Sequence, residues 1–279
     1  MVGTKYHTTL LHPEERFTLA LVRVSDASGR ARVDVPFVSG WAQLNIPVLR
    51  VPRAAEQAAF FSTLARLLRR LRRASLIDHW FLLHKAPGLR LRFRSRERGE
   101  LLARALVEQG EALRASWTGT LGFDSYFEQR ELLSGYFEEM VGNVLSLSSD
   151  SLVQSVLRAR HGDEEGWTRF TVAFLHHFLG DRWWVWEALG RFERMRGVRR
   201  AGRSHKASSS PAWKLYDPSR LLQALLREKA AAVPPGFAAS TTLLVCLNSI
   251  FNQWELEADV QSRVLQKARQ VTSPELARP

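Results

Sequence analysis

The chain has 279 residues, of which 45% are hydrophobic and 24% are charged, close to the averages of globular proteins. This composition excludes a wholly disordered chain, and no apolar run approaches the roughly 18 residues of a membrane-spanning helix. Cys246 is the only cysteine, which excludes a disulfide within the chain and a multi-cysteine metal site. No apolar stretch of a secretory signal is visible at the N-terminus, so we expect a cytoplasmic location.

The net charge is strongly positive, because 40 Lys and Arg residues stand against 28 Asp and Glu residues, which gives +12 at pH 7. Only six of the basic residues are lysine, so guanidinium groups carry most of the charge. A surface of this kind attracts polyanions, whether nucleic acid, anionic lipid or an acidic peptide. Nucleotide bias in the gene would produce the same arginine-rich composition, so charge alone does not select a partner.

Strands dominate the predicted structure of the first hundred residues. Alternating apolar residues predict strands at residues 17–22, 32–37, 41–51, 80–83 and 89–93. The first two form a hairpin or two short strands around a turn at residues 25–29, and Pro47 marks an edge or a bulge.

Helices dominate the rest of the chain. A 3.6-residue period predicts helices at residues 53–73, 100–117, 136–160, 167–194, 218–231 and 240–270, the last being one long helix or two. Residues 123–135 are predicted to be irregular, and the basic, Ser/Gly-rich residues 197–211 to be a mobile loop. We therefore expect an α+β fold with mixed or antiparallel sheets and packed helices, in a single domain over residues 1–279 with N-terminal strands in residues 1–40.

One predicted strand carries arginine at every second position. Strand side chains alternate between two faces, so one face would hold Arg90, Arg92, Arg94 and Arg96, and the other Leu89, Leu91 and Phe93. Guanidinium groups this close repel one another unless anions or acidic side chains lie opposite. The pattern indicates either a solvated edge strand protected by charge or an anion-binding wall inside a groove.

Five short motifs follow one another along the chain: WAQLN at 41–45, WFLL with LRLRF at 80–93, FDSYFE with SG at 123–135, SDS at 149–151 and LNS at 247–249. In their order and spacing they resemble the C-terminal elimination-type domain of class I lanthipeptide dehydratases, also called the thiopeptide-type bacteriocin biosynthesis domain. The resemblance covers about residues 40–270, and it implies the same α+β fold.

The chain departs from this family at residues that carry elimination. Gly88 occupies the position of a histidine in the family motif. Leu244 occupies the position of a second histidine, the one that resembles the acid–base residue of the elimination domain. An enzyme that eliminates glutamate must remove an α-proton, so it needs such a base. The departure argues against plain elimination.

We expect the chain to act without a glutamylation domain, and in this it is similar to the pyridine synthases of thiopeptide biosynthesis. That resemblance implies a formal aza-[4+2] cycloaddition of two dehydroalanines in a leader-bearing, azole-containing precursor peptide. Water and the leader are expelled, which leaves a pyridine in a macrocycle. It implies no cofactor and no metal, and a precursor peptide with an acidic leader as the partner. We expect no nucleic-acid or membrane partner, and a homodimer is one option for the oligomeric state.

The candidate site residues are those that could move protons or hold a peptide. Proton transfer is assigned as a hypothesis to His84, Tyr126, Glu128 and Asp150, and peptide binding to Arg90, Arg92, Arg94, Ser151 and Asn248. The 9 Trp and 15 Phe residues would suit azole rings. Structural roles compete with these assignments: Tyr126 as a packing aromatic, Asp150 and Ser151 as a helix cap or turn, and Asn248 as a buried clasp.

Three other functions stay open. The chain could be the glutamate-eliminating half of a split dehydratase, which the missing histidine at Leu244 opposes. It could be a basic nucleic-acid-binding protein that uses residues 66–73, 90–96 and 191–203, although no helix-turn-helix, zinc-finger or RNP-type motif supports this. It could also be a peptide-binding scaffold without catalysis.

Overall fold

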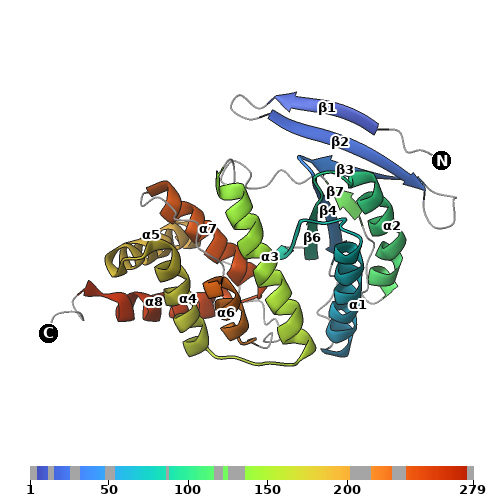
Figure 1. Cartoon of the computed structure of the whole chain (residues 1–279). Coiled ribbons are helices and arrows are strands. Elements are labelled where there is room, and N and C mark those ends of the chain that lie inside the picture. The colour runs from blue at the N-terminus through green and yellow to red at the C-terminus, as the bar shows by residue number, and fades with distance from the viewer. Residues whose placement is uncertain are drawn as a thin grey trace. The chain divides into compact units, whose positions relative to one another are not determined.

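The computed structural model describes residues 5–11, 16–25, 32–47, 54–85, 88–115, 122–124, 136–201, 215–227 and 237–274. The chain divides into two compact units, Met1–Glu131 and Leu132–Pro279, called here the sheet unit and the helical unit (Figure 1). The predicted α+β class is confirmed. This division does not test whether either unit folds alone, so one domain over residues 1–279 stays a prediction. No helix among the described residues is long and apolar enough to cross a membrane.

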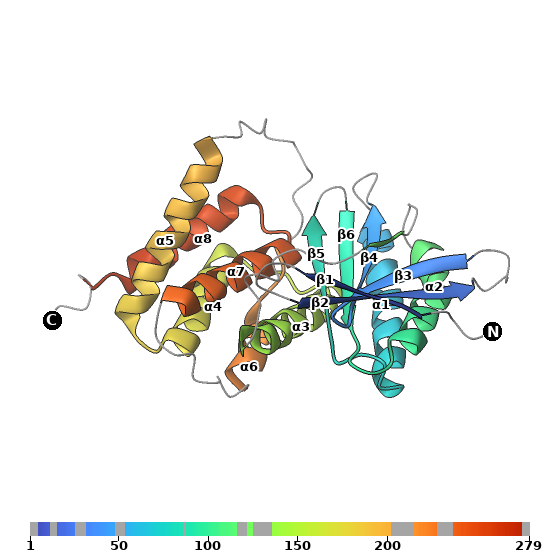
Figure 2. The same cartoon turned by 90° about the horizontal axis from the view of Figure 1, so that it is seen from above.

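The sheet unit contains one antiparallel sheet in the order β1-β2-β3-β4-β6-β5, with β7 paired to β4 (Figure 2). Its strands are β1 (Lys5–Leu11), β2 (Arg16–Ser25), β3 (Arg32–Val38), β4 (Trp41–Pro47), β5 (His79–Lys85), β6 (Gly88–Arg94) and β7 (Gly122–Asp124). Five of them coincide with predicted strands. Strand β1 was not predicted, and the prediction that residues 123–124 are irregular is wrong. Strand β7 has only three residues and exists through its pairing with β4.

A tight turn at Ser39–Gly40 joins β3 to β4. Both residues have positive φ, 45° and 82°, as a two-residue hairpin with right-handed strand twist requires. A Cβ atom on Gly40 would lie 2.9 Å from the backbone oxygen of Ser95, so glycine also permits the close approach of the next segment. The turn fixes the register in which β3 meets β4.

One face of the sheet is apolar and packs against helices. It carries Ala42 and Leu44 of β4 and Leu91 and Phe93 of β6, all fully buried. Helices α1 (Ala54–Arg73) and α2 (Gly99–Ala115) lie side by side, and α2 packs against β2 and β3. The predicted apolar stripe of α1 is buried throughout: Phe61, Leu64, Leu68 and Leu71.

Six helices form the helical unit: α3 (Tyr136–Leu157), α4 (Glu164–Leu179), α5 (Arg182–Ala201), α6 (Ser219–Arg227), α7 (Phe237–Gln253) and α8 (Ala258–Thr272). Helix α4 packs against α5, α6 and α8, and α3 packs against α6 and α7. Asp163 caps the start of α4, because its Oδ1 accepts a hydrogen bond from the backbone N–H of Gly166 at 2.7 Å. Trp167 lies one turn later and is fully buried.

Two helix predictions need correction. The single stretch predicted at residues 167–194 is two helices, because the chain turns at Gly180, whose φ of 71° ends α4 in the left-handed region. Helix α5 continues to Ala201, so the loop prediction is wrong for residues 197–201, and residues 202–211 lie outside the described residues. Of the two options for residues 240–270, the structure has two helices, α7 and α8.

We expect the thiol of Cys246 to be almost inert in the folded protein. Cys246 is fully buried in α7, and burial disfavours the thiolate, which raises the pKa of Cys246 to about 12. Near pH 8, thiol labelling should therefore be slower than in the denatured chain by on the order of a thousandfold. Stopped-flow labelling with a disulfide reagent, in buffer and in urea, measures this ratio. Equal rates would mean that α7 opens readily.

Candidate functional site

The register of β4, β5 and β6 places the arginines of β6 beside polar and aromatic side chains of both neighbouring strands. Arg92 lies opposite Gln43 on β4 and Phe81 on β5, and Arg90 lies opposite Asn45. Because strand side chains alternate, these residues share the face of the sheet that does not hold Leu91. We call it the arginine face; it includes Trp41, Gln43, Asn45, His79, Phe81, Leu83, Arg90, Arg92, Arg94 and Asp124.

A chain of hydrogen bonds runs across the arginine face through three strands. Arg92 Nε donates to Gln43 Oε1 at 2.8 Å, and Gln43 Nε2 donates to Asn45 Oδ1 at 2.9 Å. Asn45 Nδ2 then donates to Asp124 Oδ2 on β7 at 3.4 Å. Guanidinium has only donors, so the Gln43 oxygen must face Arg92, and this orients both amides toward the carboxylate. The chain is therefore directional, with a cation at one end and an anion at the other.

Aromatic rings flank the guanidinium groups. The Cζ atom of Arg92 lies 5.3 Å from the centre of the Phe81 ring, and that of Arg94 lies 5.9 Å from the Trp41 ring. Trp41 and Phe81 meet edge to face, with ring centres 5.2 Å apart. A planar cation over an aromatic ring is attracted by the ring's quadrupole. Flat donor groups and flat rings thus alternate across this face.

Arg92 is a fully buried charged residue, so of the residues on this face it has the largest cost of removal from water. Its side chain is 1% exposed, and Gln43 and Phe81 are 2% exposed. A guanidinium removed from water is costly unless its donors are satisfied, so the bond to Gln43 and the contact with Phe81 are needed to hold it. Beside Arg92, the half-buried Arg90 and Arg94 can donate to a carbonyl or carboxylate oxygen. The hydrogen bonds from Arg92 through Gln43 and Asn45 to Asp124 tie β4, β6 and β7 together, and a purely structural role is the alternative for Arg92.

The structure separates His84 from the arginines. His84 lies opposite Leu89 in the pairing of β5 with β6, whereas Leu83 lies opposite Arg90. The half-buried His84 side chain therefore belongs to the other face of the sheet. Arg96 also leaves the predicted set, because β6 ends at Arg94 and the Arg96 backbone N–H donates to Asp78 Oδ2 at 3.2 Å.

The remaining predicted residues lie in the helical unit or outside the described residues. Asp150 and Ser151 sit in the interior of α3, so they do not cap or end that helix; Ser151 is buried and Asp150 half-buried. Asn248 is half-buried on α7, which packs against α3. Tyr126 and Glu128 lie outside the described residues. Where the structure is described, no group of three or more His, Cys, Asp and Glu side chains could hold a metal ion.

Gln43, Asn45 and Asp124 were not among the predicted site residues. The sequence offered one indication of the first two: both are polar, two positions apart, in a strand whose intervening residues are apolar. That spacing puts them on one face. Nothing in the sequence pairs Asp124 with this strand, because Asp124 comes 79 residues after Asn45.

No protein-family model and no curated protein matches the chain. Among solved structures, the chain is similar to the tRNA dependent lantibiotic dehydratase MibB from Microbispora sp. 107891, with a TM-score of 0.54 and 20% sequence identity over 85% of this chain. The chain spans 28% of the length of MibB. It is also similar to TsrL, with a TM-score of 0.46 and 13% identity over 85% of this chain and 95% of TsrL. The likeness to MibB shows a shared fold.

Proposed function

We propose that this chain modifies a ribosomally made peptide and that its reaction is the aza-[4+2] cycloaddition of two dehydroalanines. The observation that carries the proposal is the arginine face: oriented guanidinium and amide groups between aromatic rings, in a fold shared with a lantibiotic dehydratase. Peptide carbonyls accept hydrogen bonds from such donors, and the half-buried Arg90 and Arg94 are the guanidinium groups of this face that a peptide can reach.

The proposed reaction is redox-neutral. One dehydroalanine and the preceding amide, as its imidic acid tautomer, form the four-atom azadiene, and the second dehydroalanine supplies the two-atom alkene. Two σ bonds close the six-membered ring. Loss of water from the former amide carbon, and of the leader as a carboxamide, then makes the ring aromatic. Holding two distant alkenes in contact can account for about 7–11 kcal/mol of barrier lowering, so positioning is the main task of the protein.

Leu244 supports cycloaddition over glutamate elimination. Its side chain is 2% exposed, among the core residues of α7. An aliphatic residue there cannot remove an α-proton, whereas elimination needs a base. In the elimination-type domains that the chain resembles, the acid–base histidine stands at this position. In this chain a buried leucine occupies it.

The assignment of residues to proton transfer to and from the amide is a proposal. His84, Tyr126, Glu128 and Asp150 are the proposed acid–base groups. Arg90, Arg92 and Arg94, together with Ser151 and Asn248, are proposed to bind the peptide. His84 lies on the opposite sheet face from Arg92, so we propose that it acts on a different part of the peptide from the one that the arginines hold.

The test is mass spectrometry of a synthetic leader-bearing peptide with two dehydroalanines and azoles, incubated with the protein alone. We expect a product that has lost water and the leader, and a second product that is the leader ending in a carboxamide. Heat-denatured protein is the control.

Two outcomes would overturn the proposal. A peptide of unchanged mass that still binds the protein would indicate a scaffold without catalysis. A glutamylated peptide that lost only glutamate would indicate the eliminating half of a split dehydratase.

A further inference from the structure

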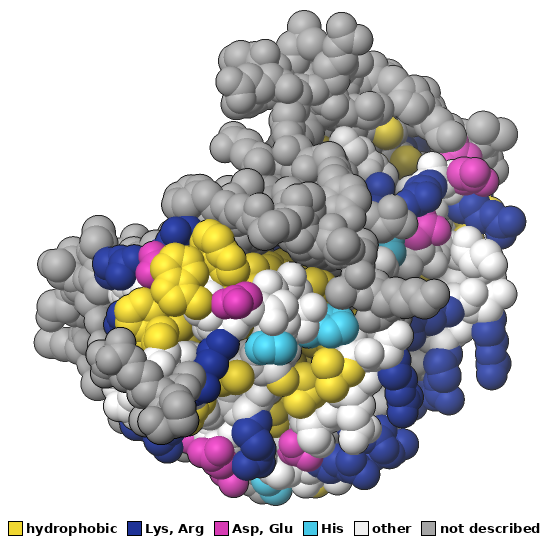
Figure 3. Space-filling model, turned by 60° about the vertical axis from the view of Figure 1, so that its left-hand side comes forward, with side chains coloured by type: hydrophobic (Ala, Val, Ile, Leu, Met, Phe, Trp, Pro, Cys, Tyr) yellow, Lys and Arg dark blue, Asp and Glu magenta, His cyan; other side chains and the backbone are white. Residues whose placement is uncertain are grey.

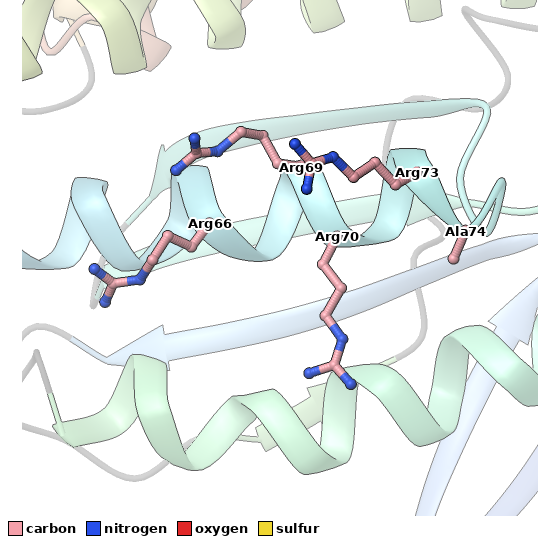
Figure 4. A pocket seen from close by; sticks show the side chains of 5 residues that line it. All are labelled: Arg66, Arg69, Arg70, Arg73 and Ala74. Carbon is pink, nitrogen blue, oxygen red and sulfur yellow. The ribbon is translucent and has the colours of Figure 1, made fainter.

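A second cationic surface lies on α1, within the sheet unit. Arg66, Arg69, Arg70 and Arg73 are all exposed, and with Ala74 they line an open hollow of about 560 Å³. Lys and Arg side chains also project in a group along one edge of the molecule in Figure 3. Figure 4 shows Arg66, Arg69 and Arg73 leaning along the helix toward its N-terminus, while Arg70 extends to the side. We call these four residues the arginine row.

The spacing of the row brings like charges together. Its members stand at positions i, i+3, i+4 and i+7, which are neighbours on one helix face. Like charges at this spacing destabilise a helix. Favourable interaction with the helix dipole explains why cations stand in the last turn, so it accounts for Arg70 and Arg73. It does not account for Arg66 and Arg69, which lie before that turn.

The described part of the chain offers the row no carboxylate. Arg66 Nη2 donates to Thr63 Oγ1 at 3.0 Å, and Arg69 Nε donates to the Ala65 carbonyl at 3.4 Å. Helix α1 has one acidic residue, Glu56, in its first turn. Arginines elsewhere do find acids: Arg263 pairs with Glu164 at 2.7 Å. Arg98 extends the cationic surface, because its Nη1 donates to the Ala74 carbonyl at 3.0 Å.

The surroundings of the row favour carboxylates on a peptide over single-stranded nucleic acid. Proteins hold single strands by stacking bases on exposed aromatic rings, and the aromatic residues of α1, Phe60 and Phe61, are buried. Arg66 and Arg70 are four residues apart, as are Arg69 and Arg73, so each pair spans about 6 Å along the axis. Carboxylates four residues apart on a helical peptide have the same rise.

We propose that the arginine row docks an acidic segment of the peptide that the chain modifies. This inference rests on the proposed function for the identity of that peptide. The row would hold the segment by forked contacts between guanidinium and carboxylate groups, and the arginine face would hold the reacting part.

The test is fluorescence anisotropy with a labelled helical peptide that has glutamate at every fourth position. We expect the variant R66Q/R69Q/R70Q/R73Q to bind it at least about tenfold more weakly than the parent chain at low salt. The matched control, R158Q/R160Q/R169Q/R227Q, removes the same four charges from exposed positions of the helical unit, so both variants fall from +12 to +8. It should lose less than about threefold, because screening confines each charge to about 8–10 Å. Circular dichroism checks that both variants are folded.

Equal losses in the two variants would overturn the inference, because net charge alone would then explain binding. Tighter binding of a short RNA duplex than of the peptide, lost in the row variant, would assign the row to nucleic acid instead. The anisotropy assay measures binding without any reaction, so its result does not depend on whether the chain catalyses the cycloaddition. A chain that binds the peptide through the row but forms no pyridine would contradict only the proposed function.

Discussion

Replacing Trp167 with alanine should destabilise the helical unit by about 3–5 kcal/mol, the range for deleting a buried aromatic side chain. Trp167 is fully buried, and its ring centre lies 5.3 Å from that of Phe170 and 5.2 Å from that of Trp254. Its Nε1 donates to the Tyr216 carbonyl at 3.0 Å, so the substitution also leaves a buried acceptor without this donor. Urea unfolding followed by circular dichroism measures the change.

The matched control is Trp183→Ala. Trp183 is 50% exposed at the start of α5, so the same change of residue type should cost about 1 kcal/mol or less. A similar loss in both variants would mean that the cluster around Trp167 is not the core of this unit. Since small domains are stable by about 5–15 kcal/mol, the Trp167 variant should lose a large part of its folded population on mild heating.

Replacing Arg92 with methionine should affect both stability and function. Gln43 Oε1 would lose its donor while buried, at a cost of about 1–3 kcal/mol, and relief from burying a charge offsets part of this. If the arginine face binds the peptide, the loss of a charged donor also weakens binding by roughly 10–100-fold. Urea unfolding and peptide titration measure the two effects separately.

Two further variants interpret that result. Arg169→Met removes the same charge from an exposed position of α4 and should leave both stability and binding nearly unchanged. R92M/Q43M replaces both partners with apolar groups, so it should be less destabilised than the sum of the single variants. A loss of stability in R92M with unchanged peptide affinity would make Arg92 a structural tie between strands.

The local patterns of the chain were enough to predict most of the sheet unit. Alternating residues in WAQLN and LRLRF predict strands, and the side-chain period of two assigns Arg92 and Leu91 to opposite faces before any partner is known. The stripe of Phe61, Leu64, Leu68 and Leu71 predicts the buried face of α1 in the same way. Strand β7 was not predicted because three residues are too few to show an alternating pattern. The break at Gly180 was not predicted because the residues on both sides of it have helical patterns.

The sequence by itself therefore determined the α+β class, the faces of individual strands and helices, and the position of the arginines on β6. Only the tertiary structure decided which strands are neighbours, and this pairing links Arg92 to Gln43, Asn45 and Asp124 and sets His84 apart from them. The reason is physical: a period along one segment reports which side of it is buried, whereas pairing depends on contacts between segments far apart in the chain. The arginine row shows the same division. Its spacing can be read from the sequence of α1, whereas its lack of carboxylate neighbours among the described residues depends on which segments pack near that helix.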